Sequence, residues 1–274
     1  MSTFENQARR LHGASASIVR GLLVGSKLKA SSRYEFKYVL SPDQVEEVLH
    51  TLTPYLDLDP HCVDRTASSY TVRSIYWDSP RWHCFYDKCS GQQQREKFRI
   101  RTYNQGTHSP VFLESKQKHG MLCFKDKVFL CAKTLEAIEF RTLSALDPSF
   151  SPSRLLERFF YHLDRYNYLP AALVVYDRQA FSHPGEDQIR ITLDYNIRTK
   201  LFPNLAELCE EDGLAYPFGR WSILEVKFSQ IVPHWMQLLN ARFGLKPQAC
   251  SKYCNCVAHF RGETPPPSEG FYHV

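Results

Sequence analysis

The chain has 274 residues, of which 43% are hydrophobic and 14% aromatic, and its formal net charge is +5. This composition excludes a disordered chain, and so small a charge does not by itself indicate nucleic-acid binding. No stretch supplies the roughly eighteen uncharged apolar residues of a membrane span. Nine irregularly spaced cysteines without a secretion signal favour reduced thiols and a cytoplasmic location.

Alternating apolar and polar residues recur along the chain, and a period of two is typical of half-buried strands. They predict strands at 34–40, 70–78, 95–103, 110–118, 121–130, 171–181, 188–198 and 221–228. Apolar residues at helical spacing predict helices at 153–166, 233–244 and 250–260, and Ser41 before Pro42 predicts the start of another. Gly120 can adopt a positive φ and predicts a hairpin between the fourth and fifth strands.

These elements predict an α+β fold of about eight strands, mostly linked by short turns. A meander of this size hides its edges in a sandwich or a closed barrel. Residues 31–262 are expected to form this domain. Residues 1–30 are expected to be a flexible basic arm that could touch a membrane surface, and residues 263–274 a disordered Pro-rich tail.

The segment REKFRIRTYN (95–104) shows how charge is arranged on these strands. Arg95, Lys97, Arg99 and Arg101 occupy every second position and therefore share one face, while Phe98 and other apolar residues occupy the opposite face. The cationic face could be an ordinary solvated surface. It could also be a wall that holds an anion.

Several other strands separate charged from apolar faces in the same way. Their charged faces carry Glu35 and Lys37, Glu114, Lys116 and Lys118, Lys125 and Lys127, Arg190 and Asp194, and Glu225 and Lys227. A closed antiparallel barrel would place these faces around a water-filled bore, with helices packed outside. We expect such crowded cations to have few neutralising partners in the protein alone, so that a polyanion is needed to relieve their repulsion.

The chemistry of these residues favours a chain of phosphates together with a metal ion. Arginine forks and lysine point charges bind phosphate oxygens. A few carboxylates among many cations are best explained as ligands of Mg²⁺ or Mn²⁺, which prefer oxygen donors and bind together with substrate phosphates. Duplex nucleic acid is too wide for such a bore.

An ordered set of motifs resembles a known family. Arg33-x-Glu35-x-Lys37, KFRIRTY, FLESKQKHG, YDRQAF, IRITLDYNIR, ILEVKF and SKY resemble the vacuolar transporter chaperone (VTC) catalytic domain, from Arg33 to Phe260. This domain is the polyphosphate polymerase branch of the triphosphate tunnel metalloenzyme (CYTH) superfamily. Hydrolytic and cyclase relatives typically open with E-x-E-x-K, and Arg33 at the first position weakens an interpretation as a two-metal triphosphatase.

The resemblance implies an ATP–polyphosphate phosphotransferase that moves the γ-phosphoryl group of ATP to a growing polyphosphate chain inside a cationic tunnel. It implies catalytic phosphate contacts from Lys37, Arg99, Arg101, Lys116, Lys127, Arg178, Arg190 and Lys252. Further substrate contacts are expected from Arg33, Lys97, Tyr176, Arg198, Lys227 and Ser251. Glu225 is the expected principal ligand of Mn²⁺ or Mg²⁺, with Glu35, Glu114 and Asp194 as further candidates.

Two other functions stay open at this point. A hydrolase of tripolyphosphate or a nucleoside triphosphate needs only water in place of the acceptor chain. A non-catalytic module that binds polyphosphate or an inositol phosphate needs the cations alone. Some residues also have structural alternatives, because Arg178 could pair with Asp177 and Asp194 with Arg190.

Overall fold

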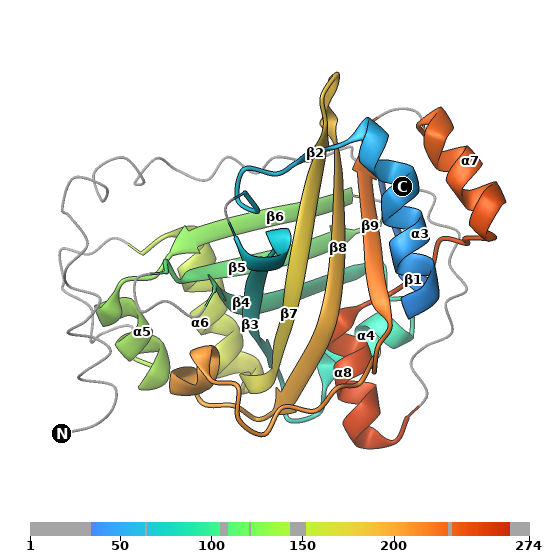
Figure 1. Ribbon diagram of the computed structural model, residues 1–274. Coiled ribbons are helices and arrows are strands. Elements are labelled where there is room, and N and C mark those ends of the chain that lie inside the picture. The colour runs from blue at the N-terminus through green and yellow to red at the C-terminus, as the bar shows by residue number, and fades with distance from the viewer. Residues whose placement is uncertain are drawn as a thin grey trace. The chain divides into compact units, whose positions relative to one another are not determined.

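The computed structural model describes residues 34–63, 65–104, 109–120, 122–142, 152–229 and 232–263 (Figure 1). The expected basic arm, Arg33 and residues 264–274 of the expected tail lie outside the described residues. None of the described helices is long and apolar enough to cross a bilayer.

Nine strands and six α-helices make up the described part of the chain. The strands are β1 (Tyr34–Leu40), β2 (Asp57–Leu58), β3 (Tyr70–Asp78), β4 (Gln94–Tyr103), β5 (Phe112–His119), β6 (Leu122–Phe129), β7 (Leu169–His183), β8 (Glu186–Leu201) and β9 (Ser222–Phe228). The α-helices are α3 (Pro42–Leu52), α4 (His83–Cys89), α5 (Ala132–Glu139), α6 (Arg154–Tyr166), α7 (His234–Phe243) and α8 (Lys252–Arg261). All eight predicted strands and all four predicted helices are therefore present.

The strands belong to one hydrogen-bonded sheet in the order β1-β9-β8-β7-β3-β4-β5-β6, and β2 pairs with β7. The pairs β1–β9, β8–β9, β4–β5, β5–β6 and β2–β7 are antiparallel. The predicted α+β class with an antiparallel sheet is confirmed. In this order β1 and β6 are the end strands, so closure of the sheet into a tunnel stays a prediction.

The chain divides into two compact units. Of the described residues, unit 1 takes those within Arg73–Leu173 and Lys200–Gly213. Unit 2 takes those within Ser31–Val72, Val174–Thr199 and Leu214–Val274. The predicted site residues are distributed over both units, and each unit is considered separately below.

In unit 1, α6 covers the apolar face of β4. Ser153 caps this helix by accepting a hydrogen bond from the Leu156 N–H at 3.3 Å. Phe159 of α6 lies 5.3 Å, ring to ring, from Phe98 of β4, which is fully buried, as is Ile100. The apolar face of β4 therefore packs under a helix, as the period-two pattern predicted. The arginines of β4 lie on the opposite face.

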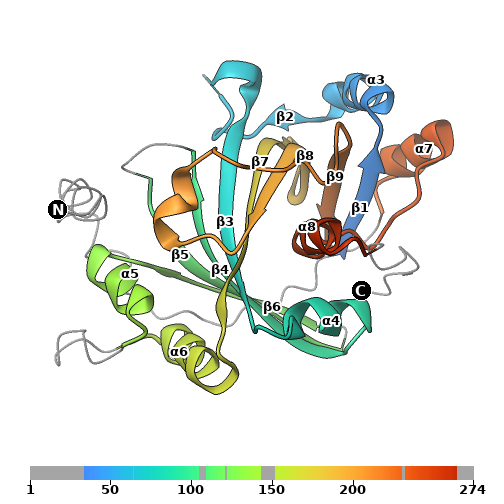
Figure 2. The same ribbon diagram turned by 90° about the horizontal axis from the view of Figure 1, so that it is seen from below.

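In unit 2, α3 and α7 cover the apolar faces of β1, β8 and β9. The two helices lie side by side (Figures 1 and 2). Their residues Val48, Leu52, Met236 and Leu239 join one buried cluster with Tyr38, Leu40, Ile189, Ile191, Leu193, Leu224, Val226 and Phe228 of the strands. Because strands alternate, the charged residues of β1 and β9 occupy the face away from this core.

Among the described strands and α-helices, β2, α4 and α5 lay outside the sequence prediction. The start of α4 is fixed by Asp78 at the end of β3, whose carboxylate accepts hydrogen bonds from the N–H groups of Ser79, Cys84 and Phe85. A helix of seven residues shows too few turns for its periodicity to be recognised. The strand β2 has two residues, which are too few to show an alternation of apolar and polar side chains.

Candidate active site

In unit 2, the antiparallel register of β1 and β9 places each acid of one strand opposite a base of the other. Glu35 faces Lys227, and Lys37 faces Glu225. Lys37 Nζ lies 2.8 Å from Glu35 Oε1 and 3.5 Å from Glu225 Oε2, and Lys227 pairs with the other oxygen of Glu225. Two E-x-K motifs on antiparallel strands thus form a ladder of alternating charges.

Asp194 of β8 joins two further cations in the same unit. Arg178 of β7 donates two hydrogen bonds to its carboxylate, from Nε at 2.6 Å and from Nη2 at 2.8 Å. Lys252, the first residue of α8, places Nζ 2.5 Å from Oδ2. Both cations also lie over the ring of Tyr176, Arg178 at 5.2 Å and Lys252 at 4.7 Å from its centroid.

These groups influence one another electrostatically and are treated as one set. The Glu225 cluster is defined as Glu35, Lys37, Arg178, Asp194, Glu225, Lys227 and Lys252. Burial by itself would raise the pKa of Glu225, but Lys37 and Lys227 hold that pKa well below its ordinary value. Burial would likewise raise the pKa of Asp194, and Arg178 lowers it. Both carboxylates are therefore ionised at neutral pH, in a buried environment.

Unit 1 contains a second charged group, the Glu114 cluster, defined as Arg99, Arg101, Glu114 and Lys127. Glu114 of β5 lies opposite Arg99 of β4 and Lys127 of β6. Its Oε2 accepts a hydrogen bond from Arg99 Nε at 2.8 Å and lies 3.6 Å from Arg101 Nη1. Burial opposes ionisation of Glu114, but the two arginines lower its pKa to about 2.

The two clusters correct one expectation. Arg99 and Arg101 share a carboxylate, and Lys37 contacts two, so these cations do have neutralising partners in the protein alone. Acid and base of the E-x-K motifs lie on the same face, and the antiparallel register then brings opposite charges together across the strands. An anion that binds here must compete with internal ion pairs.

Several predicted residues lie outside these clusters. Arg190 of β8 pairs with Asp59 at 3.1 Å, and Arg198 pairs with Asp177, also at 3.1 Å. The alternative pairings of Asp194 with Arg190 and of Arg178 with Asp177 are therefore not the ones that form. Asp177 and Arg178 are neighbours on a strand, so Arg198 lies on the face opposite the Glu225 cluster.

A positive φ of 52° at Asn196 interrupts the alternation along β8 between Asp194 and Arg198. This break explains why Asp194 and Arg198, four positions apart on one strand, contact partners on opposite faces of the sheet.

Of the remaining predicted residues, Ser251 caps α8 by accepting a hydrogen bond from the Cys254 N–H at 3.4 Å. Lys97 and Lys116 lie opposite each other on β4 and β5, one row from the Glu114 cluster.

Two residues near the arginines of unit 1 were not predicted from the sequence. Arg99 donates to the Tyr76 hydroxyl at 3.0 Å, and Arg101 donates to the Ser74 hydroxyl at 2.9 Å. Ser74 and Tyr76 occupy alternate positions of β3 and so share a face. The alternation was visible, but that β3 lies beside β4 is a feature of the sheet order, which local patterns do not encode.

The donor set of the Glu225 cluster fits one kind of metal site. Within the described residues, no three His, Cys, Asp or Glu side chains come together as a metal-binding group. Glu35 and Glu225, however, both contact the ammonium of Lys37. One or two carboxylates are what Mg²⁺ and related ions use when substrate phosphates complete the coordination. The residues fit a metal held jointly with phosphate, and not an all-protein cage.

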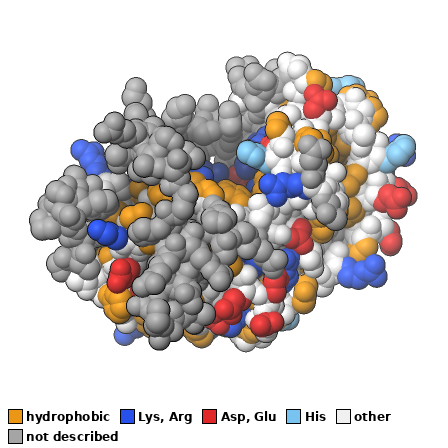
Figure 3. Space-filling model, turned by 60° about the vertical axis from the view of Figure 1, so that its left-hand side comes forward, with side chains coloured by type: hydrophobic (Ala, Val, Ile, Leu, Met, Phe, Trp, Pro, Cys, Tyr) orange, Lys and Arg blue, Asp and Glu red, His pale blue; other side chains and the backbone are white. Residues whose placement is uncertain are grey.

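Figure 3 shows the charged side chains of the described residues on one face of the molecule. Among the described residues drawn there, Lys and Arg side chains are interspersed with acidic and hydrophobic ones and form no continuous basic patch. All nine cysteines are free in the structure.

Comparisons with known proteins show the family to which the chain belongs. No curated protein matches its sequence significantly. The PH1819 protein of Pyrococcus horikoshii has a similar structure, with 15% identity, a TM-score of 0.42 and coverage of 83% of this chain and 100% of that one. A Bacillus halodurans protein proposed to be an adenylate cyclase gives 12% identity and a TM-score of 0.44, over 80% and 95% of the two chains.

The triphosphatase of the Mimivirus capping enzyme also matches, at 10% identity and a TM-score of 0.27, over 87% of this chain and 94% of that one. The family model described as the VTC domain matches residues 32–261. These residues include all the described strands and helices and both clusters. The chain therefore belongs to the VTC domain family.

Proposed function

We propose that this protein is a polyphosphate polymerase, which transfers the γ-phosphoryl group of ATP to the end of an inorganic polyphosphate chain. The Glu225 cluster is the observation that carries the proposal. It combines four cations with buried, ionised carboxylates in a chain of the VTC domain family. Cations alone would serve a binding module, whereas the carboxylates in the same cluster could also serve as metal ligands.

The reaction requires no nucleophilic side chain. A terminal phosphate oxygen of the chain attacks the γ-phosphorus, a new P–O bond forms, and the bond to the β-phosphate oxygen breaks to release ADP. Positioning and charge stabilisation supply most of the catalysis in phosphoryl transfer. In unit 2, Lys37, Arg178 and Lys252 would supply both, because their pKa values are raised and they stay charged.

Glu225, with Glu35 as a second ligand, would hold Mn²⁺ or Mg²⁺ together with substrate phosphates. When bound, such an ion neutralises the charge that develops on the transferring phosphoryl group. In the structure, Lys37 and Lys227 form ion pairs with Glu225. If this carboxylate held a metal ion, both lysines could bind phosphate oxygens instead. The lysines would thus exchange one anion for another and stay paired.

In unit 1, Arg99, Arg101 and Lys127 would bind phosphates of the substrates. Both arginines are already held in place, by Glu114 and by the hydroxyls of Tyr76 and Ser74. A guanidinium held in this way loses little conformational entropy when it binds phosphate.

Incubation with ATP and Mn²⁺, or with ATP and Mg²⁺, tests the proposal. We expect ADP and polymeric phosphate to accumulate in step, since each transfer makes one ADP and lengthens one chain by one phosphate. Release of orthophosphate without polymer would indicate a hydrolase. Intact ATP, with polyphosphate still bound by the protein, would indicate a binding module.

A further inference from the structure

A buried hydroxyl group lies opposite Glu225 in unit 2. Thr192 of β8 is the pairing partner of Glu225 of β9, which is in turn the partner of Lys37 of β1. Residues directly opposite each other on antiparallel strands point to the same face of the sheet, with Cβ atoms about 5 Å apart. Thr192 therefore lies on the face of the Glu225 cluster, within reach of the Glu225 carboxylate.

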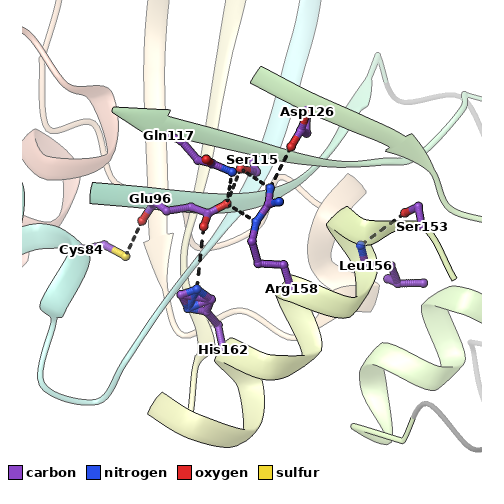
Figure 4. A network of polar contacts seen from close by, with 9 residues as sticks. All are labelled: Cys84, Glu96, Ser115, Gln117, Asp126, Ser153, Leu156, Arg158 and His162. Atoms are coloured by element: carbon purple, nitrogen blue, oxygen red, sulfur yellow. Dashed lines mark hydrogen bonds and ion pairs between the residues drawn. The ribbon is translucent and has the colours of Figure 1, made fainter. Parts of the chain in front are cut away.

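The hydroxyl of Thr192 has no hydrogen-bond partner among the described residues, although Thr192 is only 2% exposed. Most buried hydroxyls have a partner, because an unpaired polar group away from water costs free energy. Ser115 of β5 in unit 1 shows the usual arrangement. In Figure 4 it lies beside Glu96, to which it donates at 2.5 Å, and Arg158 of α6 pairs with the same carboxylate at 2.9 Å. Within the described residues, Thr192 carries the cost of burial without such a partner.

Packing alone does not explain a hydroxyl at this position. Valine has nearly the same shape as threonine and no polar atom, and it is equally well suited to a strand. Ile191 and Leu193, on either side of Thr192, already contribute the apolar face of β8 to the core of unit 2. The hydroxyl is better explained by a hydrogen bond that forms when substrate and a metal ion bind.

Glu225 can accept that hydrogen bond. In the structure, its two carboxylate oxygens pair with Lys37 and Lys227. If one oxygen held a metal ion and the lysines bound phosphate, the other oxygen would need a new donor in a buried site. The hydroxyl of Thr192 can supply one, because its hydrogen rotates to suit an acceptor. Hydrogen bonds of this kind orient a carboxylate that binds a metal, and their loss typically lowers metal affinity by roughly 10- to 100-fold.

We propose that Thr192 is a positioning residue, whose hydroxyl donates to Glu225 and holds this carboxylate in the orientation that binds Mn²⁺ or Mg²⁺. The inference rests on the proposed function and adds to it an uncharged residue that belongs to neither cluster. It also gives the hydroxyl two effects of opposite sign. The hydroxyl lowers the stability of the protein alone and stabilises the protein with metal bound.

Thr192→Val tests the proposal, because valine keeps the shape of the side chain and removes the hydroxyl. Thermal unfolding is followed for the protein alone, with tripolyphosphate and EDTA, and with tripolyphosphate and increasing Mn²⁺. We expect the variant alone to unfold about 3 °C above the wild type. Tripolyphosphate without metal should stabilise both proteins equally. Mn²⁺ should stabilise the variant less, as an affinity about tenfold weaker requires.

Two further variants and one kinetic measurement separate this role from a structural one. Thr192→Ser keeps the hydroxyl and should bind Mn²⁺ as the wild type does. Thr102→Val is the matched control, since Thr102 of β4 is also buried but donates to the Pro110 carbonyl at 3.2 Å. It should unfold at a lower temperature in every condition, with unchanged Mn²⁺ affinity. In turnover, Thr192→Val should raise the Mn²⁺ concentration for half-maximal polymer synthesis about tenfold and change the rate at saturating Mn²⁺ by less.

Equal Mn²⁺ affinity of Thr192→Val and the wild type would overturn the proposal, and the proposed function would stand if the wild type makes polymer. Weaker tripolyphosphate binding by the variant in EDTA would also overturn it, since the hydroxyl would then contact phosphate and not Glu225. A wild type that Mn²⁺ does not stabilise would refute the metal assignment and this inference together. Absence of polymer from a wild type that Mn²⁺ does stabilise would refute the polymerase alone.

Discussion

Glu225→Gln is expected to abolish polymer synthesis and to leave polyphosphate binding intact. Glutamine keeps the shape of the side chain but removes the negative charge that would hold the metal. Lys37 and Lys227 lose one carboxylate partner and become more available to phosphate. We expect kcat/KM to fall by at least about a hundredfold, with the Kd for polyphosphate unchanged or lower. Activity is measured as polymer formed from ATP, and binding by titration.

Glu46→Gln, on the exposed side of α3 in the same unit, is the matched control for loss of one carboxylate. It should behave as the wild type. Retained polyphosphate binding by Glu225→Gln also shows that the variant is folded. Wild-type turnover by Glu225→Gln would remove the assignment of Glu225 as the principal metal ligand.

Replacing Arg99 and Arg101 together by alanine is expected to weaken polyphosphate binding and to destabilise the protein. Both arginines contact Glu114, which is largely buried. Without them the carboxylate loses its two arginine partners and its pKa rises from about 2, because the effect of burial is then opposed less strongly. Removal of one side of a buried ion pair costs about 3 kcal/mol. Thermal unfolding and titration with polyphosphate measure the two effects.

The triple variant Arg99→Ala, Arg101→Ala and Glu114→Gln separates them. Neutralising Glu114 should restore much of the stability and none of the binding, since the guanidinium groups are still absent. If the double variant bound polyphosphate at wild-type affinity, these arginines would be a structural ion pair only.

The prediction of strands and faces from the sequence rests on the alternation of neighbouring residues. It succeeded where that alternation continues over many residues. The alternation in Arg95–Tyr103 correctly placed Phe98 and Ile100 in a core and the arginines on the opposite face. The same reasoning led us to expect unrelieved cationic repulsion. That expectation was wrong at Arg99, because the alternation gives the face of a residue but not its partner across the sheet.

Partners in the clusters depend on register and on strand order. Lys37 meets Glu225 because β1 and β9 pair with a particular offset, although 188 positions separate the two residues in the sequence. Arg178 was expected to pair with Asp177 if it had a structural role, and it pairs with Asp194 of the neighbouring strand instead. The motifs point to candidate site residues, and the pairing of the strands decides which of them come into contact.

The network around Arg158 was missed for a related reason. Glu96 and Asp126 stand between basic residues in the sequence, where they look like ordinary surface acids. Only the packing of α6 against β4–β6 shows that they neutralise a helix residue on the far side of the strands (Figure 4). A charge count along the strand therefore does not show which partner each of its acids neutralises.

The fate of the γ-phosphate of ATP tests the central claim most directly. Parallel reactions contain ATP labelled at the γ-phosphate and ATP labelled at the α-phosphate, each with Mn²⁺ and a short polyphosphate primer. We predict that the γ-label enters polymer, that the α-label stays in ADP, and that one ADP forms for each phosphate added. Recovery of the γ-label as orthophosphate, with none in polymer, would contradict the account.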